Sequence, residues 1–294
     1  MNNLAYYVVG LVFLFLAKTK NILTGYSTPK PFGLRDASRC AAYDTKVVDD
    51  WLRYLDEYAE GDVSLAGKAA LELGPGSDVG TGMCLLTRGL EQYSALDVND
   101  LATRAPDGFY QVLVEMIREQ GGSSSLDWLA EELRRVRLGL SSRLNYVVRT
   151  DFDITAAFGR DTFDLVFSQA AFEHFDDLEA VAAQLGVVCR PGAVVVAQID
   201  LQTHSRWIRE ADPNNIYRYS NTVYNLFRFR GSPNRMRPYQ YRTAFERHGW
   251  VNVVVRPLST LERSQVARRR LSRRFEDGIN EMHHLSVVLC ATKE

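Results

Sequence analysis

Cysteine is scarce in this sequence, and the few cysteines stand far apart. The 294 residues include four, with no CxxC spacing among them: Cys40, Cys84, Cys189 and Cys290. Disulfide frameworks and structural zinc sites need paired or closely spaced cysteines, so both are excluded. Scattered cysteines are typical of reduced, mostly buried thiols in an intracellular protein, and we expect a cytoplasmic location.

Long hydrophobic runs are also lacking, with one exception near the N-terminus. Residues 4–17 are uncharged and mostly apolar, and Lys18 and Lys20 follow them. A helix needs roughly 20 apolar residues to cross a bilayer, and a secretory signal carries its basic residues before the apolar run. Here the lysines come after it and would hold the following domain on the cytoplasmic side. Two interpretations stay open: a membrane anchor or interfacial helix, which we favour, and a helix that covers the core or the mouth of the active site.

Lysine is absent from the segment 202–275, although this segment is strongly basic. It holds 16 arginines and four acidic residues, and its arginines are interleaved with aromatic residues. Guanidinium groups bind phosphate or carboxylate through paired hydrogen bonds, and aromatic faces stack on sugars or bases. The pattern predicts an anionic ligand or an anionic membrane surface; the alternative is a solvated basic face. No RNA-binding module is recognisable, so we expect no nucleic acid partner. The candidate ligand-binding residues are Arg206, Arg218, Tyr219, Arg228, Arg235 and Arg237.

Apolar segments of strand length alternate with helical segments from residue 68 onward. Such strands are typical of a parallel sheet that helices cover on both faces, and we therefore expect an α/β fold with a doubly wound, mainly parallel sheet. We divide the chain into an apolar N-terminal helix, a linker with a helical region, and a main domain with an insertion before its last two strands. These parts span residues 1–24, 25–66 and 67–294, with the insertion at about 203–249.

A glycine-rich turn, LELGPGSDVGTG, follows the first predicted strand. A dinucleotide fingerprint requires three glycines spaced as G-x-G-x-x-G, but Val79 stands at the third position after Gly74 and Gly76. Glu72 lies just before the first glycine. A carboxylate there would repel a pyrophosphate, whereas it would attract a sulfonium or ammonium group.

Acidic residues also stand at the ends of the next two predicted strands. Asp97 ends the second strand, and Asp151 follows the third. Ligands of doubly wound sheets bind at the carboxyl ends of the strands, where a carboxylate can accept hydrogen bonds from ribose hydroxyls. Together with Glu72, these acids predict a site for a nucleoside that carries positive charge.

Five segments, LELGPG, ALDVN, RTDFD, FDLVFSQAAFEHFDD and RPGAVVVAQID, occur in this order between residues 68 and 200. In this arrangement the sequence resembles the class I S-adenosylmethionine-dependent methyltransferases. The resemblance implies a Rossmann-like sheet of seven strands that ends in an antiparallel hairpin, with the insertion as a cap over the acceptor site. Asp78 is a departure, because many members have a third glycine there. The insertion is most similar to those of methyltransferases from bacterial surface-polysaccharide pathways.

The resemblance implies S-adenosylmethionine as the cofactor and assigns its contacts to the strand ends. They are Glu72, Gly74 and Gly76 at the methionine end, Asp97 at the ribose, Asp151 and Phe152 at the adenine, and Ser168 and Gln169 facing the sulfonium. The acceptor would be an oxygen or nitrogen of a small molecule or of a glycan- or lipid-linked compound, and the basic segment would suit an anionic one.

Methyl transfer to a hydroxyl also needs a group that removes a proton. His174 and His204 follow the fourth and fifth strands, where the methyl group is expected, and Asp200 is a candidate orienting partner for His204. Glu173 adjoins His174, and some quinone-pathway methyltransferases bind a metal at a similar Glu-His pair with a further acid. Here Ala170 takes the place of that acid, so we predict no metal.

Two alternatives stay open at the level of function. An NAD-dependent oxidoreductase can be built on a similar sheet. A non-catalytic, methyltransferase-like protein could instead dock partners through its basic face.

Overall fold

The computed structural model describes residues 2–25, 36–120, 126–140 and 142–294. Residues 26–35, within the expected linker and helical region, lie outside the described residues. Residues 37–59 of that region form helix α2 (Ala37–Ala59), which begins after Asp36, whose side chain accepts a hydrogen bond from the Arg39 amide.

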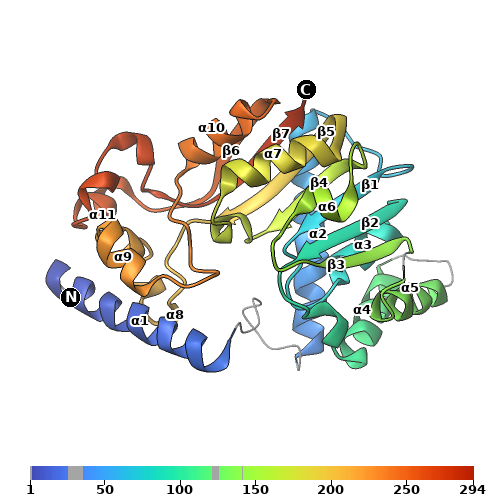
Figure 1. The fold of residues 1–294 in the computed structure, drawn as a ribbon, viewed down its shortest axis with the longest axis horizontal. Coiled ribbons are helices and arrows are strands. Elements are labelled where there is room, and N and C mark those ends of the chain that lie inside the picture. The colour runs from blue at the N-terminus through green and yellow to red at the C-terminus, as the bar shows by residue number, and fades with distance from the viewer. Residues whose placement is uncertain (1, 26–35, 121–125, 141) are drawn as a thin grey trace.

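Seven strands form one sheet in the order β3-β2-β1-β4-β5-β7-β6 (Figure 1). Strands β1 to β5 run parallel, and β7 runs antiparallel to both β5 and β6. The expected fold class, with its closing antiparallel pair, is therefore confirmed. The strands are β1 (Ala69–Leu73), β2 (Gln92–Asp97), β3 (Leu144–Val148), β4 (Phe163–Gln169), β5 (Cys189–Asp200), β6 (Trp250–Thr260) and β7 (His284–Lys293).

The strand order changes direction at β1, which pairs with β2 on one side and β4 on the other. In a doubly wound sheet this is the switch point, where the loops after the strands diverge and leave room for a ligand. The residues after β1, β2, β4 and β5 are therefore the ones that the fold brings to a candidate site.

Alternate side chains of each strand pack into two separate cores, one on each face of the sheet, because successive side chains of a strand point to opposite faces. Leu71 and Leu73 belong to one core, and Ala70 belongs to the other. In the core of Ala70, Trp51 of α2 stacks on Phe167 of β4, with ring centroids 5.0 Å apart. The helices on this face are α2, α3 (Gly80–Thr87), α4 (Asp107–Glu119) and α5 (Asp127–Arg137); the opposite face carries α6 (Ile154–Phe158), α7 (Leu178–Val188) and α10 (Pro238–Arg247).

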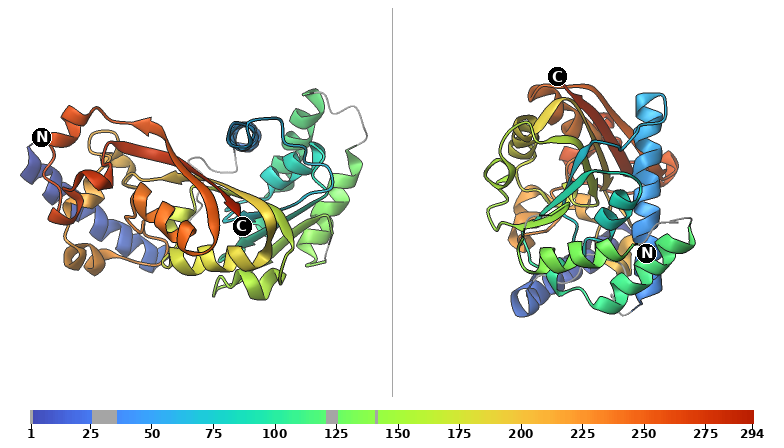
Figure 2. Two further views of the ribbon diagram at one scale, coloured as in Figure 1. Left: turned by 90° about the horizontal axis from the view of Figure 1, so that it is seen from above. Right: turned by 90° about the vertical axis from the view of Figure 1, so that its right-hand side faces the viewer.

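A third apolar cluster lies in a cap, which we define as residues 201–237 and 261–283. The cap sits at the end of the molecule away from α4 and α5, and helix α1 (Asn3–Thr24) lies along it (Figures 1 and 2). The insertion expected at about 203–249 thus divides, because α10 packs on the sheet while Leu271 and Phe275 join the cap from beyond β6. The cap elements are α8 (Arg206–Arg209), η3 (Asn215–Arg218), α9 (Asn221–Phe227), α11 (Arg263–Ala267), η4 (Arg273–Phe275) and η5 (Gly278–Asn280).

Candidate functional site

The glycine loop after β1 has a backbone that requires glycine at two positions. Gly74 and Gly76 have φ angles of 72° and 78°, in the left-handed region that residues with a side chain rarely adopt. A Cβ atom on Gly74 would lie 2.7 Å from the Cβ of Ala171. The loop can therefore pass close to the start of the segment after β4 only because Gly74 has no side chain.

Glu72 is buried at the end of β1 and bonded to protein groups. Its Oε2 accepts hydrogen bonds from the hydroxyl of Thr81 in α3, at 2.6 Å, and from the hydroxyl of Tyr93 in β2. Burial raises the pKa of Tyr93 well above its usual value, and the Glu72 charge adds to this shift, so this hydroxyl keeps its proton and donates. Glu72 thus holds three elements together beside the loop. These two partners were missed from the sequence.

Asp97, the last residue of β2, fixes the glycine loop from the other side. Its carboxylate accepts hydrogen bonds from the amides of Gly76, at 3.2 Å, and Asn99, at 2.9 Å. Burial raises the pKa of Asp97, although the hydrogen bonds from the backbone oppose this effect. The residue expected at the ribose therefore lies next to the residue expected at the methionine end.

The segment after β3 carries Asp151 and Phe152. Asp151 is exposed and forms an ion pair with Arg149, with N–O distances of 3.0 and 2.8 Å. Phe152 adopts a positive φ of 53°, and its ring centroid lies 5.0 Å from that of Phe175. At this corner, aromatic surface is thus contributed by Phe152, while the Asp151 carboxylate is already paired.

Ser168 and Gln169 at the end of β4 differ in their surroundings. Ser168 is fully buried, and its hydroxyl donates to the carbonyl of Leu73 at 2.9 Å. Gln169 has a buried Oε1 without a hydrogen-bond partner. Ser168 therefore ties β4 to β1, whereas the Gln169 amide is the polar group left over at this strand end.

Three titratable side chains gather beyond β4 and β5. Glu173 and His174 lie in the short helix η2 (Phe172–His174), and His204 lies in the loop after β5. The rings of His174 and His204 are 4.9 Å apart, and His204 Nε2 lies 3.9 Å from both Glu173 Oε1 and Asp200 Oδ2. Asp200 also accepts a hydrogen bond from Arg209 at 2.6 Å. His174, His204 and Asp200 thus lie together, and Arg209 is a further partner that was not foreseen from the sequence.

Burial sets the charges in this cluster. It raises the pKa of Glu173 well above its usual value, and the Asp200 charge adds to the effect. Burial lowers the pKa of His174. The pKa of His204 is also lowered, by the protein packed around it and by His174, although 36% of its side chain is exposed. Burial therefore favours the protonated form of Glu173 and the neutral form of both imidazoles, and a neutral imidazole keeps a lone pair that can accept a proton.

Glu173, His174 and His204 are also a group whose atoms could hold a metal ion. One ligand atom from each lies within 4.8 Å of the others, and both carboxylate oxygens of Glu173 and Nδ1 of His174 are buried without hydrogen-bond partners. The prediction of no metal rested on Glu173, His174 and Ala170, and His204 was not foreseen as a third candidate ligand. The absence of a metal stays a prediction.

Most of the six candidate ligand-binding side chains are engaged inside the protein. Arg237 is fully buried and donates to three backbone carbonyls. Arg235 donates to two carbonyls and lies over the ring of Tyr224, and burial lowers its pKa to about 10. Arg218 pairs with Asp212 at 2.6 Å, and Tyr219 donates to a carbonyl of α1. This differs from the expected acceptor contacts, because these donors satisfy buried acceptors of the cap.

Arg206 and Arg228 lie nearer the surface than the other candidates. Arg206 lines a shallow pocket together with Gln202 and Glu210. Arg228 is partly exposed and pairs with Asp176, which follows η2. These two arginines are therefore the members of the set whose guanidinium groups stand closest to solvent.

Comparison with known proteins gives one family match. Residues 121–197 match a family model described as a methyltransferase domain; the glycine loop precedes the matched residues. A search among curated proteins finds no match to the chain.

Several solved structures have a similar fold. The chain is 14% identical to the CurJ carbon methyltransferase, with a TM-score of 0.48 over 99% of this chain and 67% of that one. It is 16% identical to phosphoethanolamine N-methyltransferase 2 of Haemonchus contortus, with a TM-score of 0.47 over 83% of this chain and 52% of that one. It is 12% identical to an S-adenosylmethionine-dependent methyltransferase of Mesorhizobium loti, with a TM-score of 0.44 over 89% and 100%. At these identities and TM-scores the similarities carry no argument about substrate or partners.

The family match falls on β3, β4 and most of β5, and these strands lead into Asp151, Gln169 and the histidine cluster. It supports the expectations of an enzyme and of S-adenosylmethionine as its cofactor. The chain therefore carries a methyltransferase domain match within a sheet of the expected fold class.

Proposed function

We propose that the protein transfers a methyl group from S-adenosylmethionine to an oxygen or nitrogen of a small-molecule or glycan- or lipid-linked acceptor. One observation carries this proposal. The glycine loop and Asp97 lie on the β1–β2 side of the switch point, and Glu173, His174 and His204 lie on its β4–β5 side. A cofactor bound along the first side would present its methyl group toward the second.

In this reaction the acceptor atom attacks the methyl carbon, the carbon–sulfur bond breaks, and its electron pair stays on sulfur. The protein mainly has to align the two partners. A hydroxyl acceptor must also lose its proton to a base within hydrogen-bond reach.

We assign the base to His204. Its side chain is 36% exposed, whereas Nδ1 of His174 is buried, so an acceptor can reach His204 more easily. A neutral imidazole can take the proton, and the Asp200 carboxylate at 3.9 Å stabilises the resulting imidazolium. Arg209 holds Asp200 in place through its hydrogen bond. His174 is then a neighbour that packs against the base.

We further propose that the acceptor carries negative charge and meets Arg206 or Arg228. Both arginines are linked to the cluster of Glu173, His174 and His204. Arg206 lies two residues after His204 in the sequence, and Arg228 forms an ion pair with Asp176, which follows η2. Their charges would attract a phosphate or carboxylate of the acceptor.

Incubation with methyl-labelled S-adenosylmethionine and separated lipid, glycan and small-molecule extracts tests the proposal. We expect label in one of these fractions with the intact protein and none with His204→Asn. If S-adenosylhomocysteine binds but no fraction is labelled, the protein is better described as a non-catalytic binding protein of this fold.

A further inference from the structure

Helix α1 has two apolar faces, and the cap covers only one of them. Tyr7, Leu11 and Leu14 pack against the third apolar cluster. The adjoining face is exposed, and its apolar residues recur at helical spacing. They are Leu4, Val8, Val12, Phe15 and Ile22, which are 70%, 51%, 50%, 56% and 71% exposed. We call these five residues the outer stripe.

Cap side chains hold the inner face of α1 through its backbone. Asn215 donates to the carbonyl of Tyr6, and Tyr219 donates to the carbonyl of Tyr7, both at 3.0 Å. Gly10 permits this approach, because a Cβ there would lie 1.9 Å from Asn215 Oδ1. The cap is therefore fitted to this particular helix along its length.

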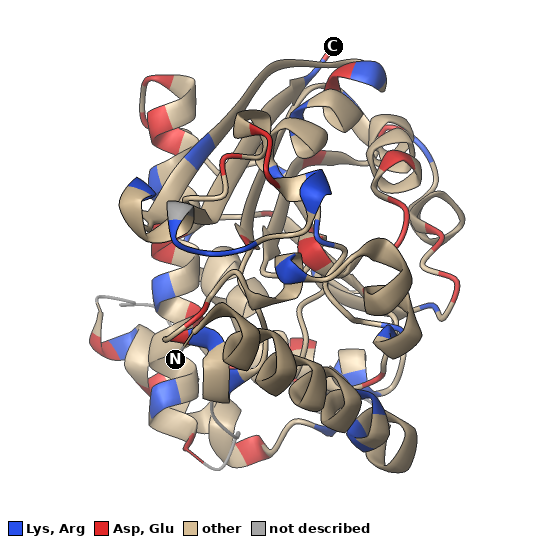
Figure 3. Cartoon of the chain, turned by 90° about the vertical axis from the view of Figure 1, so that its left-hand side faces the viewer, with Lys and Arg blue, Asp and Glu red and all other residues tan. Residues whose placement is uncertain are grey.

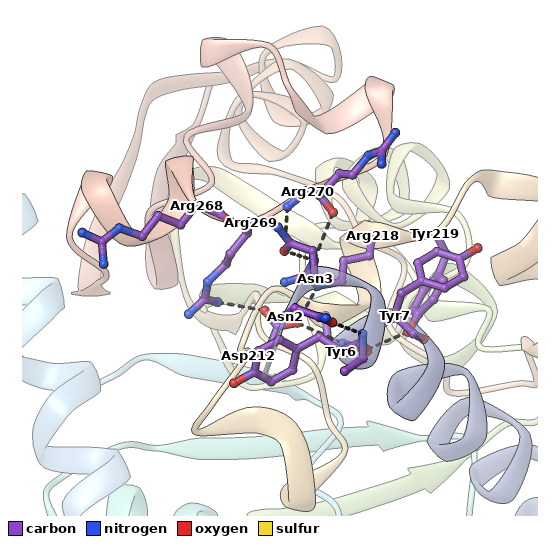
Figure 4. Close-up of polar contacts among 12 residues, drawn as sticks. Asn2, Asn3, Tyr6, Tyr7, Asp212, Arg218, Tyr219, Arg268, Arg269 and Arg270 are labelled. Carbon is purple, nitrogen blue, oxygen red and sulfur yellow. Dashed lines mark hydrogen bonds and ion pairs between the residues drawn. The ribbon is translucent and has the colours of Figure 1, made fainter.

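The first residues of α1 are fastened in the same way (Figure 4). The side chain of Asn3 accepts hydrogen bonds from Arg218, at 2.9 Å, and from the Arg270 amide, and it donates to the carbonyl of Arg268. Arg218 in turn is paired with Asp212 and buried. A helix that left the cap to cross a bilayer would strand these buried polar groups, each at a cost comparable to a lost hydrogen bond.

Positive charge flanks the outer stripe, and α1 itself contains no acidic residue. Arg268 and Arg270 lie exposed beside its N-terminal end. Lys18 and Lys20 lie toward its other end, where Lys18 donates to the carbonyl of Leu226. Figure 3 shows few charged residues along most of this helix. An apolar stripe with basic residues at both ends matches the interface of an anionic bilayer, where acyl chains meet negative headgroups.

We propose that α1 lies in the plane of an anionic membrane surface, with its outer stripe in the acyl boundary and its inner face on the cap. Among the described residues, α1 alone is long and apolar enough to cross a membrane, but the cap contacts favour lying on the bilayer over spanning it. If the proposed methyl transfer holds, this position brings a lipid-linked acceptor to the cap side of the molecule.

Flotation of the full-length protein with vesicles tests the proposal. We expect binding to vesicles of phosphatidylcholine with phosphatidylglycerol and little binding to phosphatidylcholine alone. The variant Val8→Ser/Val12→Ser/Phe15→Ser should have an affinity for the anionic vesicles that is lower by about tenfold or more. The matched control Leu138→Ser/Leu140→Ser/Ile279→Ser changes exposed apolar residues elsewhere and should bind as the unaltered protein does.

A labelling experiment separates lying on the bilayer from crossing it. Single cysteines are introduced by Asn2→Cys and Lys20→Cys, and vesicle-bound protein is treated with a maleimide that cannot pass the bilayer. The four native cysteines are buried and serve as the background. Both new thiols should react from outside; protection of Asn2→Cys would show a spanning helix and overturn the proposal.

Absence of flotation, or equal binding to both vesicle types, would also overturn it. Neither experiment needs a cofactor or an acceptor, so its failure would leave the proposed methyl transfer standing. Conversely, the stripe variant should still bind S-adenosylhomocysteine if it is folded and the proposed function holds.

Discussion

The two sides of the switch point differ in how their buried polar groups are satisfied. On the β1–β2 side, the carboxylates of Glu72 and Asp97 accept hydrogen bonds from the protein. On the β4–β5 side, the carboxylate of Glu173 and Nδ1 of His174 are buried without partners. Unsatisfied buried groups cost free energy and are therefore rare unless they serve a function. We therefore infer that the first side is a frame for the cofactor and that the second side is where the proposed chemistry takes place.

The largest expected effect is on the β4–β5 side. Replacing the proposed base in His204→Ala should lower kcat about 10²- to 10⁴-fold, the usual contribution of a general base, with unchanged binding of S-adenosylhomocysteine. The control His248→Ala removes a histidine that pairs with Glu179 instead and should keep its activity. An unchanged kcat in His204→Ala would contradict the assignment of the base to the β4–β5 side.

A substitution in the glycine loop on the β1–β2 side should lower the stability of the folded protein. Gly74→Ala combines a positive φ with a clash against Ala171 and should lower the free energy of unfolding by about 2–4 kcal/mol. Gly139→Ala is the matched control, because Gly139 has a φ of 66° in the turn that ends α5 and open space around its Cβ position, and it should cost only about 1 kcal/mol. Urea unfolding measures both; equal losses would mean that the loop does not need the close approach.

The ribose contact is the next test of the frame. Asp97→Ala should weaken the binding of S-adenosylhomocysteine by about 1–3 kcal/mol, because ribose hydroxyls would lose their acceptor. Asp151→Ala should cause a smaller loss, since the Asp151 carboxylate is exposed and already paired with Arg149. Calorimetric titration measures both affinities, and a larger loss for Asp151→Ala would reverse the assignment.

Glu173 allows a test through pH. Its pKa is raised by folding, so the folded state keeps a proton that the unfolded state releases, and this contribution to stability is lost as pH rises above the ordinary carboxyl range. Glu173→Gln carries no such proton. Its stability relative to the unaltered protein should therefore increase from pH 5 to pH 8. His174 and His204, whose pKa values are lowered, act oppositely by destabilising as pH falls below 6.5, but both variants share them. A pH-independent difference would mean that Glu173 is ionised in the folded protein.

The smallest expected effect is that of a chelator. With His204 as the base, EDTA should leave kcat unchanged. Loss of activity that a divalent cation restores would instead make Glu173, His174 and His204 metal ligands, for which their ligand atoms are close enough.

Much of the fold could be predicted from the sequence because its signals are local. The apolar run of β5 and the spacing of Leu178, Val181 and Leu185 in α7 appear directly as a strand and a helix. The glycine loop could be placed for the same reason, since a turn after a buried strand needs residues that tolerate a positive φ.

The partners of the site residues could not be predicted, because they come from distant parts of the chain. Thr81 and Tyr93 reach Glu72 only once α3 and β2 are packed. Arginines such as Arg235 and Arg237 look alike in the sequence whether they face a ligand or satisfy buried carbonyls. The fit of α1 to the cap likewise depends on Asn215 and Tyr219, which periodicity along the helix does not reveal.

We propose that carboxylates and glycines at the ends of β1 and β2 form a site for a nucleoside that carries a sulfonium group. Calorimetric titration of the protein with S-adenosylmethionine, and separately with NAD, tests it most directly. We expect saturable binding of S-adenosylmethionine at one site per chain and no measurable binding of NAD. Binding of NAD without S-adenosylmethionine would contradict it.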